Sequence, residues 1–143
     1  MASARNLVPS PELQVELERL AKVVLKPKGA ILFRRGDDVT GVYLIRSGRI
    51  SLGLDHESPV YPARMLGPGA IAGLPASISG NAYSLTAEVV EDSELAFVRR
   101  EAVVECLRKN PFLCFQVMDL LSDEIADIRS ASKQSSSHSG ATA

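Results

Sequence analysis

Cysteine and histidine are the residues best suited to metal or redox chemistry, and this 143-residue sequence has two of each. Cys106 and Cys114 lack a Cys-x-x-Cys spacing and lie in apolar, helix-like stretches, so we expect structural thiols rather than redox or metal ligands. His56 lies in a turn-like stretch and His138 in a serine-rich one. Two distant imidazoles cannot supply the three or four ligands of a zinc or iron site, so no metal site is expected.

The parts needed for nucleophilic catalysis are also missing. Ser77 and Ser84 have no plausible histidine partner to act as a base. The sequence contains neither a G-x-S-x-G elbow nor a P-loop. We therefore predict that the protein is not an enzyme.

The amino-acid composition argues against some classes of binding partner. Sixteen Lys and Arg oppose seventeen Asp and Glu, and a net charge of −1 argues against electrostatic attraction of the whole chain to nucleic acid or an anionic membrane. Aromatic residues make up only 5%, with no Trp, so platforms for stacking bases are scarce. No apolar run indicates a signal peptide or a membrane span, and the cytoplasm is the expected compartment.

The first predicted secondary-structure element of the chain is a helix near the N-terminus. Ser10-Pro11-Glu12 has the residue types of a helix start, and the leucine spacing predicts a short amphipathic helix over 13–22. We divide the chain into a leader, a single domain with C-terminal helices at 100–129, and a flexible Ser-rich tail. Their limits are 1–9, 10–129 and 130–143.

The middle of the chain consists of short β-rich runs separated by Gly and Pro turn signals, which is typical of an all-β barrel or a double-sheet jelly roll. The expected strands are 23–25, 30–33, 42–45, 49–54, 63–66, 83–90 and 94–98. Ser47-Gly48 between two of them predicts a β-hairpin turn. Residues 70–79 predict a short helical turn.

The C-terminal part is predicted to be helical. One helix covers 100–108, and Asn110-Pro111 starts a second. Apolar residues of this second helix recur in steps of four and three, the spacing of a heptad seam. They are Cys114, Met118, Leu121, Ile125 and Ile128. The helix either covers an open face of the β-roll or pairs with a second copy in a homodimer. Acidic residues on the flanks of the seam would oppose parallel pairing.

The order of the motifs is specific. KGAILFRRGD at 28–37 is followed by VYLIRSGRI at 42–50, LGPG at 66–69 and EDSEL at 91–95, with Asn110-Pro111 before a long helix. This order resembles the cyclic-nucleotide-binding domain of the catabolite activator protein and fumarate-nitrate regulator superfamily. The resemblance implies a mainly β fold with flanking helices. It would be a double-stranded β-helix (a cupin-like jelly roll) with an N-terminal and a long C-terminal helix, and it would sense a small effector.

In that family a short helix presents backbone amides to the cyclic phosphate. A Gly-Glu pair holds the ribose hydroxyl and an Arg pairs with the phosphate. The matching stretch here is 72–84, which we call the cassette: Gly73 matches the glycine, but Leu74 replaces the Glu and Asn81 the Arg. The ligand-binding residues that the resemblance implies are Gly73, Leu74, Ala76, Asn81, Ala82, Tyr83 and Ser84.

These two replacements decide the functional expectation. Hydrogen bonds to charged groups contribute about 1.5–3 kcal/mol, and an unpaired buried hydroxyl costs about 1–3 kcal/mol. Losing both contacts would weaken binding by about two to four powers of ten. We considered Arg46 and Arg64 as substitutes for the missing arginine, and we expect both to face solvent on the outside of the roll.

The resulting hypothesis is a stand-alone regulatory or sensory domain acting through effector binding or protein interaction, with ordinary cyclic AMP and cyclic GMP binding weak or lost. The alternative is a functional sensor, for a cyclic nucleotide or another small effector, belonging to a transcriptional regulator with a remodelled pocket. No cofactor is expected apart from such a small anionic effector. Residues 130–143 have Lys133 as their one basic residue and predict no recognition helix. Direct DNA binding is therefore not expected, unless the chain is a fragment of a longer regulator.

Overall fold

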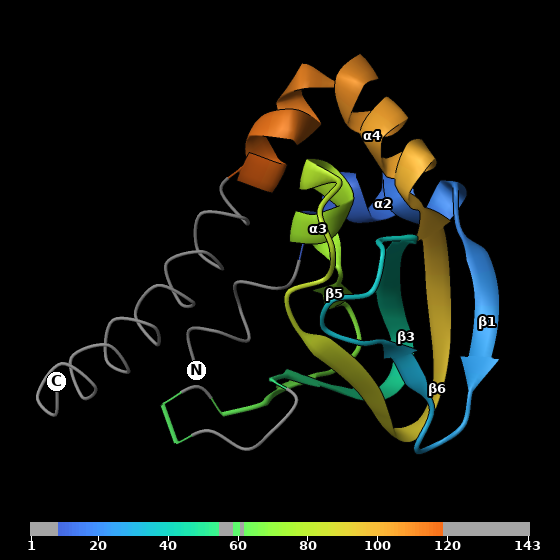
Figure 1. Ribbon diagram of the computed structural model, residues 1–143. Helices are drawn as coiled ribbons and strands as arrows, with labels where there is room; N and C mark the ends of the chain where they lie inside the picture. The colour runs from blue at the N-terminus through green and yellow to red at the C-terminus, as the bar shows by residue number, and fades with distance from the viewer. Residues whose placement is uncertain (1–8, 55–58, 61, 119–143) are drawn as a thin grey trace, which may run out of the picture.

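The computed structural model describes residues 9–54, 59–60 and 62–118 (Figure 1). The strands of this part form one antiparallel sheet, rolled up on itself, in which β1, β6, β3 and β4 are neighbours in that order. β2 pairs with β6, and β5 pairs with β3. The elements are α2 (Pro11–Arg19), β1 (Lys22–Lys26), β2 (Ile31–Phe33), β3 (Gly41–Gly53), β4 (Arg64–Leu66), β5 (Ile71–Ala72), α3 (Leu74–Ser79), β6 (Thr86–Arg99) and α4 (Arg100–Lys109).

The three labelled helices gather at one end of the roll in Figure 1. α2 begins as predicted, with the Ser10 hydroxyl accepting a hydrogen bond from the backbone N–H of Leu13 at 3.3 Å and with Pro11 in the first turn. It ends at Arg19 rather than Lys22, because Lys22 already belongs to β1. The predicted mainly β fold with flanking helices is confirmed.

The hairpin expected at Ser47-Gly48 is wrong. β3 continues through these residues as one long strand, and it pairs with β6 from Gly41 opposite Arg99 to Gly53 opposite Thr86. The two strands expected at 83–90 and 94–98 are likewise the single strand β6. The pairing register shifts around Ser47, so this segment is a bulge and not a chain reversal.

Gly48 and Ser93 explain why the bulge carries residues typical of a turn. Gly48 has a φ of +99°, and a Cβ at this position would lie 2.0 Å from the Ser93 hydroxyl oxygen. That hydroxyl donates to the carbonyl of Glu91 at 2.7 Å and accepts from the N–H of Arg49 at 3.1 Å. The Ser93 side chain thus occupies the space that the glycine leaves.

Two apolar clusters form the core. The interior cluster lies inside the roll, and the helix-facing cluster lies between the sheet and the helices. The interior cluster contains Phe33, Ile45, Ile50, Leu52, Leu66, Ala70, Ala72, Ala76, Tyr83, Leu85, Ala87, Val89 and Leu95. The helix-facing cluster contains Leu13, Leu17, Val42, Leu44, Ile71, Leu74, Ala96, Val98, Val103, Cys106, Leu107, Leu113 and Val117. Ile45 before the bulge and Ile50 after it both face the interior, because the extra residue changes the alternation of the strand.

The second C-terminal helix is visible over residues 111–118. Its face toward the domain is formed by Leu113 and Val117, which are buried, whereas Cys114 is half-buried and Met118 is 56% exposed. The rest of the predicted seam, Leu121, Ile125 and Ile128, lies outside the described residues, as do residues 1–8 of the leader and all of the tail. Among the helices of the described part, none has the length and apolar character required to cross a membrane.

The bulge can be tested with a matched pair of glycine substitutions. Gly29 has a φ of +94° and open space around it, so Gly29→Ala should cost about 1–2 kcal/mol from backbone strain alone. Gly48→Ala should cost about 1–3 kcal/mol more, because the new methyl group collides with Ser93. Urea unfolding measures both free energies of unfolding, and equal losses would contradict the packing of the bulge.

Candidate functional site

Near the start of the cassette, Gly73 occupies a position that strongly disfavours any residue with a side chain. Gly73 caps α3 with a φ of +92°, and a Cβ there would lie 2.9 Å from the carbonyl oxygen of Gly41 and 3.2 Å from the ring of Tyr83. Gly80 ends α3 with a φ of +82°, and its N–H donates to the carbonyl of Ala76 at 2.8 Å. The cassette helix is therefore short and held close to the start of β3.

Tyr83 fixes the other end of the cassette. Its ring stacks on Phe33, with the ring centroids 3.8 Å apart and the planes at 10°. Its hydroxyl donates to the carbonyl of Gly41 at 2.8 Å and accepts from the N–H groups of Thr40 and Gly41 at 3.1 Å. The side chain is 3% exposed, so Tyr83 is a buried residue that connects the cassette to the start of β3.

The structure divides the predicted ligand-binding residues among four environments. Ala76 and Tyr83 belong to the interior cluster. Leu74 belongs to the helix-facing cluster, which also contains residues of α2 and α4, and it is 2% exposed. Gly73 is half-buried, and the remaining residues are exposed: Asn81, Ala82 and Ser84. Their role in binding stays a prediction.

The cassette is also bonded to the C-terminal helices. The Nε–H of Arg100, the first residue of α4, donates to the carbonyl of Ser77 at 3.0 Å. The same guanidinium lies over Gly80, where a Cβ would come within 2.7 Å of it. A backbone carbonyl at the end of α3 is thus satisfied by a side chain from α4. No local pattern indicates this contact, since the two residues are far apart in the chain.

The orientation expected for Arg64 is wrong, whereas that of Arg46 is confirmed. Arg46 is exposed on β3 and forms an ion pair with Glu94 at 3.5 Å. Arg64 is 9% exposed and lies on the same face of β4 as the buried Leu66, while Met65 between them is 50% exposed. The alternation of a strand could have revealed this, because residues two apart share a face. The general rule that arginine stays at the surface pointed the other way.

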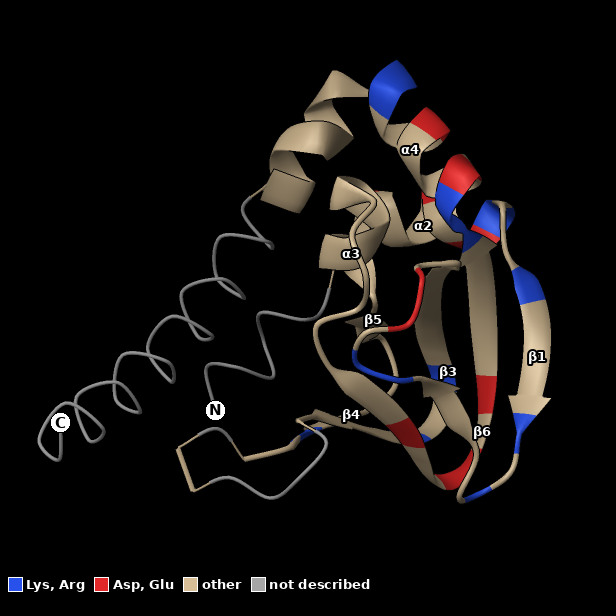
Figure 2. Cartoon of the chain, in the orientation of Figure 1, with Lys and Arg blue, Asp and Glu red and all other residues tan. Residues whose placement is uncertain are grey.

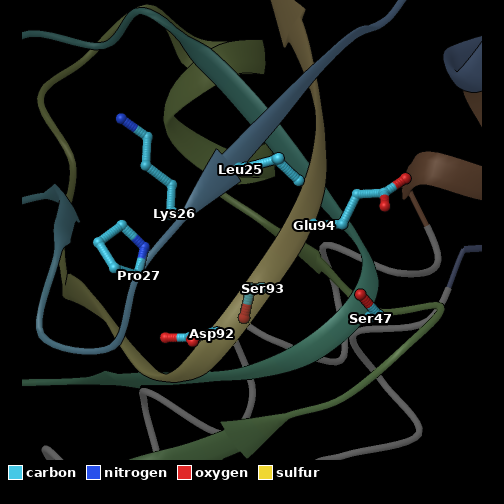
Figure 3. A pocket seen from close by; sticks show the side chains of 7 residues that line it. All are labelled: Leu25, Lys26, Pro27, Ser47, Asp92, Ser93 and Glu94. Carbon is cyan, nitrogen blue, oxygen red and sulfur yellow. The ribbon is translucent and has the colours of Figure 1, made fainter.

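A separate hollow of about 470 Å³ lies beside the bulge, on the outside of the roll (Figure 3). It is lined by Leu25, Lys26, Pro27, Ser47, Asp92, Ser93 and Glu94. Its acidic groups already have partners, because Asp92 accepts from the backbone N–H of Lys28 at 2.8 Å and Glu94 pairs with Arg46. The hollow shares no residue with the cassette.

Charge and thiol chemistry add little to the site. Figure 2 shows basic and acidic residues interspersed along α4, where Glu105 pairs with Arg108 and Lys109. Burial raises the pKa of the Cys106 thiol, which favours its neutral form. No group of three or more His, Cys, Asp or Glu within the described ranges could hold a metal ion.

Comparison with known proteins identifies the fold. The family model described as the cyclic nucleotide-binding domain matches residues 23–110, which include the cassette and most of the roll. The chain belongs to the cyclic nucleotide-binding domain family. This confirms the resemblance inferred from the order of the motifs.

Similar proteins of this family are bacterial regulators. The chain is 29% identical over 104 residues to a cyclic AMP receptor protein of Thermus thermophilus, which covers 72% of this chain and 48% of that protein. It is 30% identical over 123 residues to an anaerobic regulatory protein of Bacillus subtilis, covering 85% of this chain and 52% of that one. The crystal structure of the Thermus thermophilus catabolite activator protein superposes with a TM-score of 0.74 at 26% identity, covering 89% of this chain and 60% of that chain. The chain thus spans about half the length of the curated relatives it matches.

The contribution of the Tyr83 hydroxyl to stability can be tested by removing its oxygen atom. Tyr83→Phe keeps the stack on Phe33 but leaves the buried backbone groups of Gly41 without their partner, which should lower the free energy of unfolding by about 1–3 kcal/mol. Tyr43→Phe is the control, because the Tyr43 hydroxyl makes no hydrogen bond within the described part of the chain. Thermal unfolding measures the two losses, and equal stability of both variants would contradict the role of the hydroxyl.

Proposed function

We propose that this cyclic-nucleotide-binding-like regulatory domain binds ordinary cyclic AMP and cyclic GMP weakly or not at all. The observation that carries the proposal is the position of Leu74. Where the family has a carboxylate for the ribose hydroxyl, this chain has an apolar side chain buried in the helix-facing cluster. Leu74 cannot accept a hydrogen bond, and Asn81 brings no charge to a phosphate.

A regulatory rather than an enzymatic role is supported by the names of the relatives, a cyclic AMP receptor protein and an anaerobic regulatory protein. We infer that the domain acts in the cytoplasm and works through an effector or a protein partner. The chain matches about half of each of these relatives, so the proposed role is that of an effector-binding domain alone.

A second candidate function is a working effector sensor with a remodelled pocket. The observation in its favour is Arg64, a positive side chain buried inside the roll. The two candidates differ in whether the interior of the roll still binds an anionic small molecule.

We also propose that the partner of the C-terminal helix is a second copy of this chain. Phe112, Phe115 and Met118 on the helix at 111–118 are 65%, 68% and 56% exposed. Apolar side chains grouped in this way mark interaction surfaces. The heptad spacing that begins at Cys114 and Met118 continues in the sequence to Ile128, which favours helix pairing as the means of covering them.

Weak cyclic AMP binding can be tested by restoring the missing charge. Asn81→Arg should raise the affinity for cyclic AMP about 10- to 100-fold, the equivalent of one charged hydrogen-bond contact. Because Asn81 is exposed, the substitution should leave the fold intact. Ser84→Arg, at an equally exposed cassette position, is the matched control and should not raise it. Isothermal titration calorimetry measures both, and submicromolar affinity of the unchanged protein would contradict the proposal.

Leu74→Glu tests the other replacement through stability. A carboxylate placed in the helix-facing cluster has no partner there, so we expect a loss of about 2–5 kcal/mol in the free energy of unfolding. Chemical denaturation measures the loss. A stable variant would show that position 74 can turn toward a ligand.

Self-association can be tested at Met118. Met118→Asp should shift the protein from dimer to monomer, because a charge replaces an exposed apolar side chain in the predicted seam. Leu25→Asp is the control, since Leu25 is 74% exposed but lies on β1, away from the C-terminal helix. Sedimentation velocity over a range of concentrations gives the oligomeric state. A monomeric unchanged protein, or a variant that remains dimeric, would contradict the pairing.

A further inference from the structure

We propose that the open edge of β1 (Lys22–Lys26) is a docking site for an extended segment of a protein partner, apolar in its middle and acidic at its ends, which adds to the sheet as a further strand. The inference gives a surface to the protein partner named in the proposed function, and it rests on that proposal only in taking the domain to act through a partner. It starts from the place of β1 in the sheet.

β1 is an edge strand. It pairs with β6 along its whole length, from Lys22 opposite Phe97 to Lys26 opposite Ser93, and with no other strand in the ranges that the structure describes. Figure 1 shows it at the outer side of the roll. In an antiparallel ladder, every second residue of an edge strand directs its N–H and C=O groups away from its partner. These groups are a template to which an extended segment can bond.

The side chains of β1 add an apolar surface to this edge. Val23 and Leu25 share one face of the strand and are 49% and 74% exposed. No other large apolar side chain in the described residues is as exposed as Leu25. Val24, between them, faces the other way and packs against the interior cluster. An added strand would cover the two exposed side chains with cross-strand contacts.

The hollow beside the bulge gives this edge a place for a side chain (Figure 3). Leu25 and Ser47 are both opposite Glu94, so the three residues form one row across β1, β6 and β3. All three line the hollow of about 470 Å³, together with Pro27. A partner side chain that packs on Leu25 has this space to occupy. In strand addition, main-chain hydrogen bonds supply affinity and such side-chain pockets supply specificity.

Charge determines the composition of the segment that fits. Lys22 and Lys26 lie at the two ends of β1 (Figure 2), and neither side chain forms an ion pair with a described residue. The acidic groups of the hollow, in contrast, already have partners within the chain. Carboxylates on an added strand, placed opposite the two lysines, would gain favourable cross-strand pairs, whereas lysines there would be repelled.

The same lysines oppose pairing of β1 with a second copy of this chain. In an antiparallel pair centred on Val24, Lys22 of each copy would lie opposite Lys26 of the other, and like charges directly opposite each other destabilise a sheet. Lysines on edge strands are a common means of preventing such self-association. The occupant that fits is therefore a different chain, with apolar residues opposite Val23 and Leu25 and an acidic residue opposite each lysine.

The experiment uses a short peptide with this pattern, acetyl-Ser-Glu-Ile-Thr-Val-Glu-Ser-amide, and a matched peptide in which both Glu are Lys. NMR titration of the full chain up to millimolar peptide measures the affinity and locates the site, and amide hydrogen exchange measures the protection of β1. We expect the Glu peptide to bind about ten-fold or more tightly than the Lys peptide and to slow exchange at the outward-directed amides of β1.

A third peptide tests the backbone pairing. It is the Glu peptide with N-methyl groups on both the Ile and the Thr amides. Because consecutive amides of a strand point to opposite sides, one of the two must face β1 and lose its hydrogen bond. We expect this peptide to bind about ten-fold more weakly than the Glu peptide. Equal affinities would contradict the addition of a strand.

Variants of the chain provide the matching tests. Lys22→Glu combined with Lys26→Glu should reverse the preference, so that the Lys peptide binds more tightly than the Glu peptide. Arg34→Glu combined with Arg35→Glu changes the charge by the same amount at exposed positions after β2, and should leave the preference unchanged. Leu25→Asp should weaken binding of the Glu peptide about ten-fold or more. Thermal unfolding identifies any variant that has lost its fold, and the three peptides test the unchanged chain independently of the variants.

The outcomes that overturn the inference are distinct from those that overturn the proposed function. No binding of the Glu peptide, equal affinities for the Glu and Lys peptides, or NMR changes confined to residues outside β1 would overturn the docking site. Slow exchange of all β1 amides without any peptide would show that the edge is already covered, and would overturn it as well. Each of these results would leave weak cyclic AMP binding and the pairing of the C-terminal helix standing, because calorimetry with cyclic AMP and sedimentation of Met118→Asp test those separately.

Discussion

The antiparallel pairing of β3 with β6 determines where every other strand lies, because β1 and β2 pair with β6 while β4 and β5 pair with β3. β3 contributes to the interior cluster at both ends of the roll only if apolar residues on each side of the bulge face inward. The bulge at Ser47 and Gly48 achieves this by changing the alternation between Ile45 and Ile50. The interior cluster therefore depends on Gly48 and on the Ser93 hydroxyl that occupies the space beside it. The cassette depends on them too, since part of it belongs to that cluster.

The cassette lies where the two apolar clusters meet. Within one turn of α3, Leu74 packs toward the helices and Ala76 toward the interior, while Arg100 holds the carbonyl of Ser77 from α4. Under the proposed function, Leu74 takes the place of the family's carboxylate, so an apolar side chain of the helix-facing cluster stands where a polar ligand contact would be. Arg64 has the opposite character, since it places a charge on the face of β4 that also carries the buried Leu66.

The sequence was sufficient to predict the fold class, the start of α2, and the positions of most strands, because these depend on local patterns. It failed at Ser47-Gly48, where a bulge and a hairpin turn both require a glycine with positive φ and polar neighbours. The partner strand distinguishes the two, and the partner is distant in sequence. The cassette stays a prediction from the resemblance to the family, and the burial of Leu74 in the helix-facing cluster depends on elements distant in sequence. The contact between Arg100 and Ser77 and the burial of Arg64 are likewise products of tertiary structure.

The order in which the strands pair has a consequence during protein synthesis. Lys22 of β1 pairs with Phe97, and Gly41 of β3 pairs with Arg99, so the early strands meet their partner only after almost the whole roll has left the ribosome. Contacts between residues this far apart slow folding, because the chain loses entropy before the contacts form. Until β6 emerges, β1 and β2 have no strand to pair with in the sheet, and their open edges are surfaces on which nascent chains can aggregate or recruit chaperones.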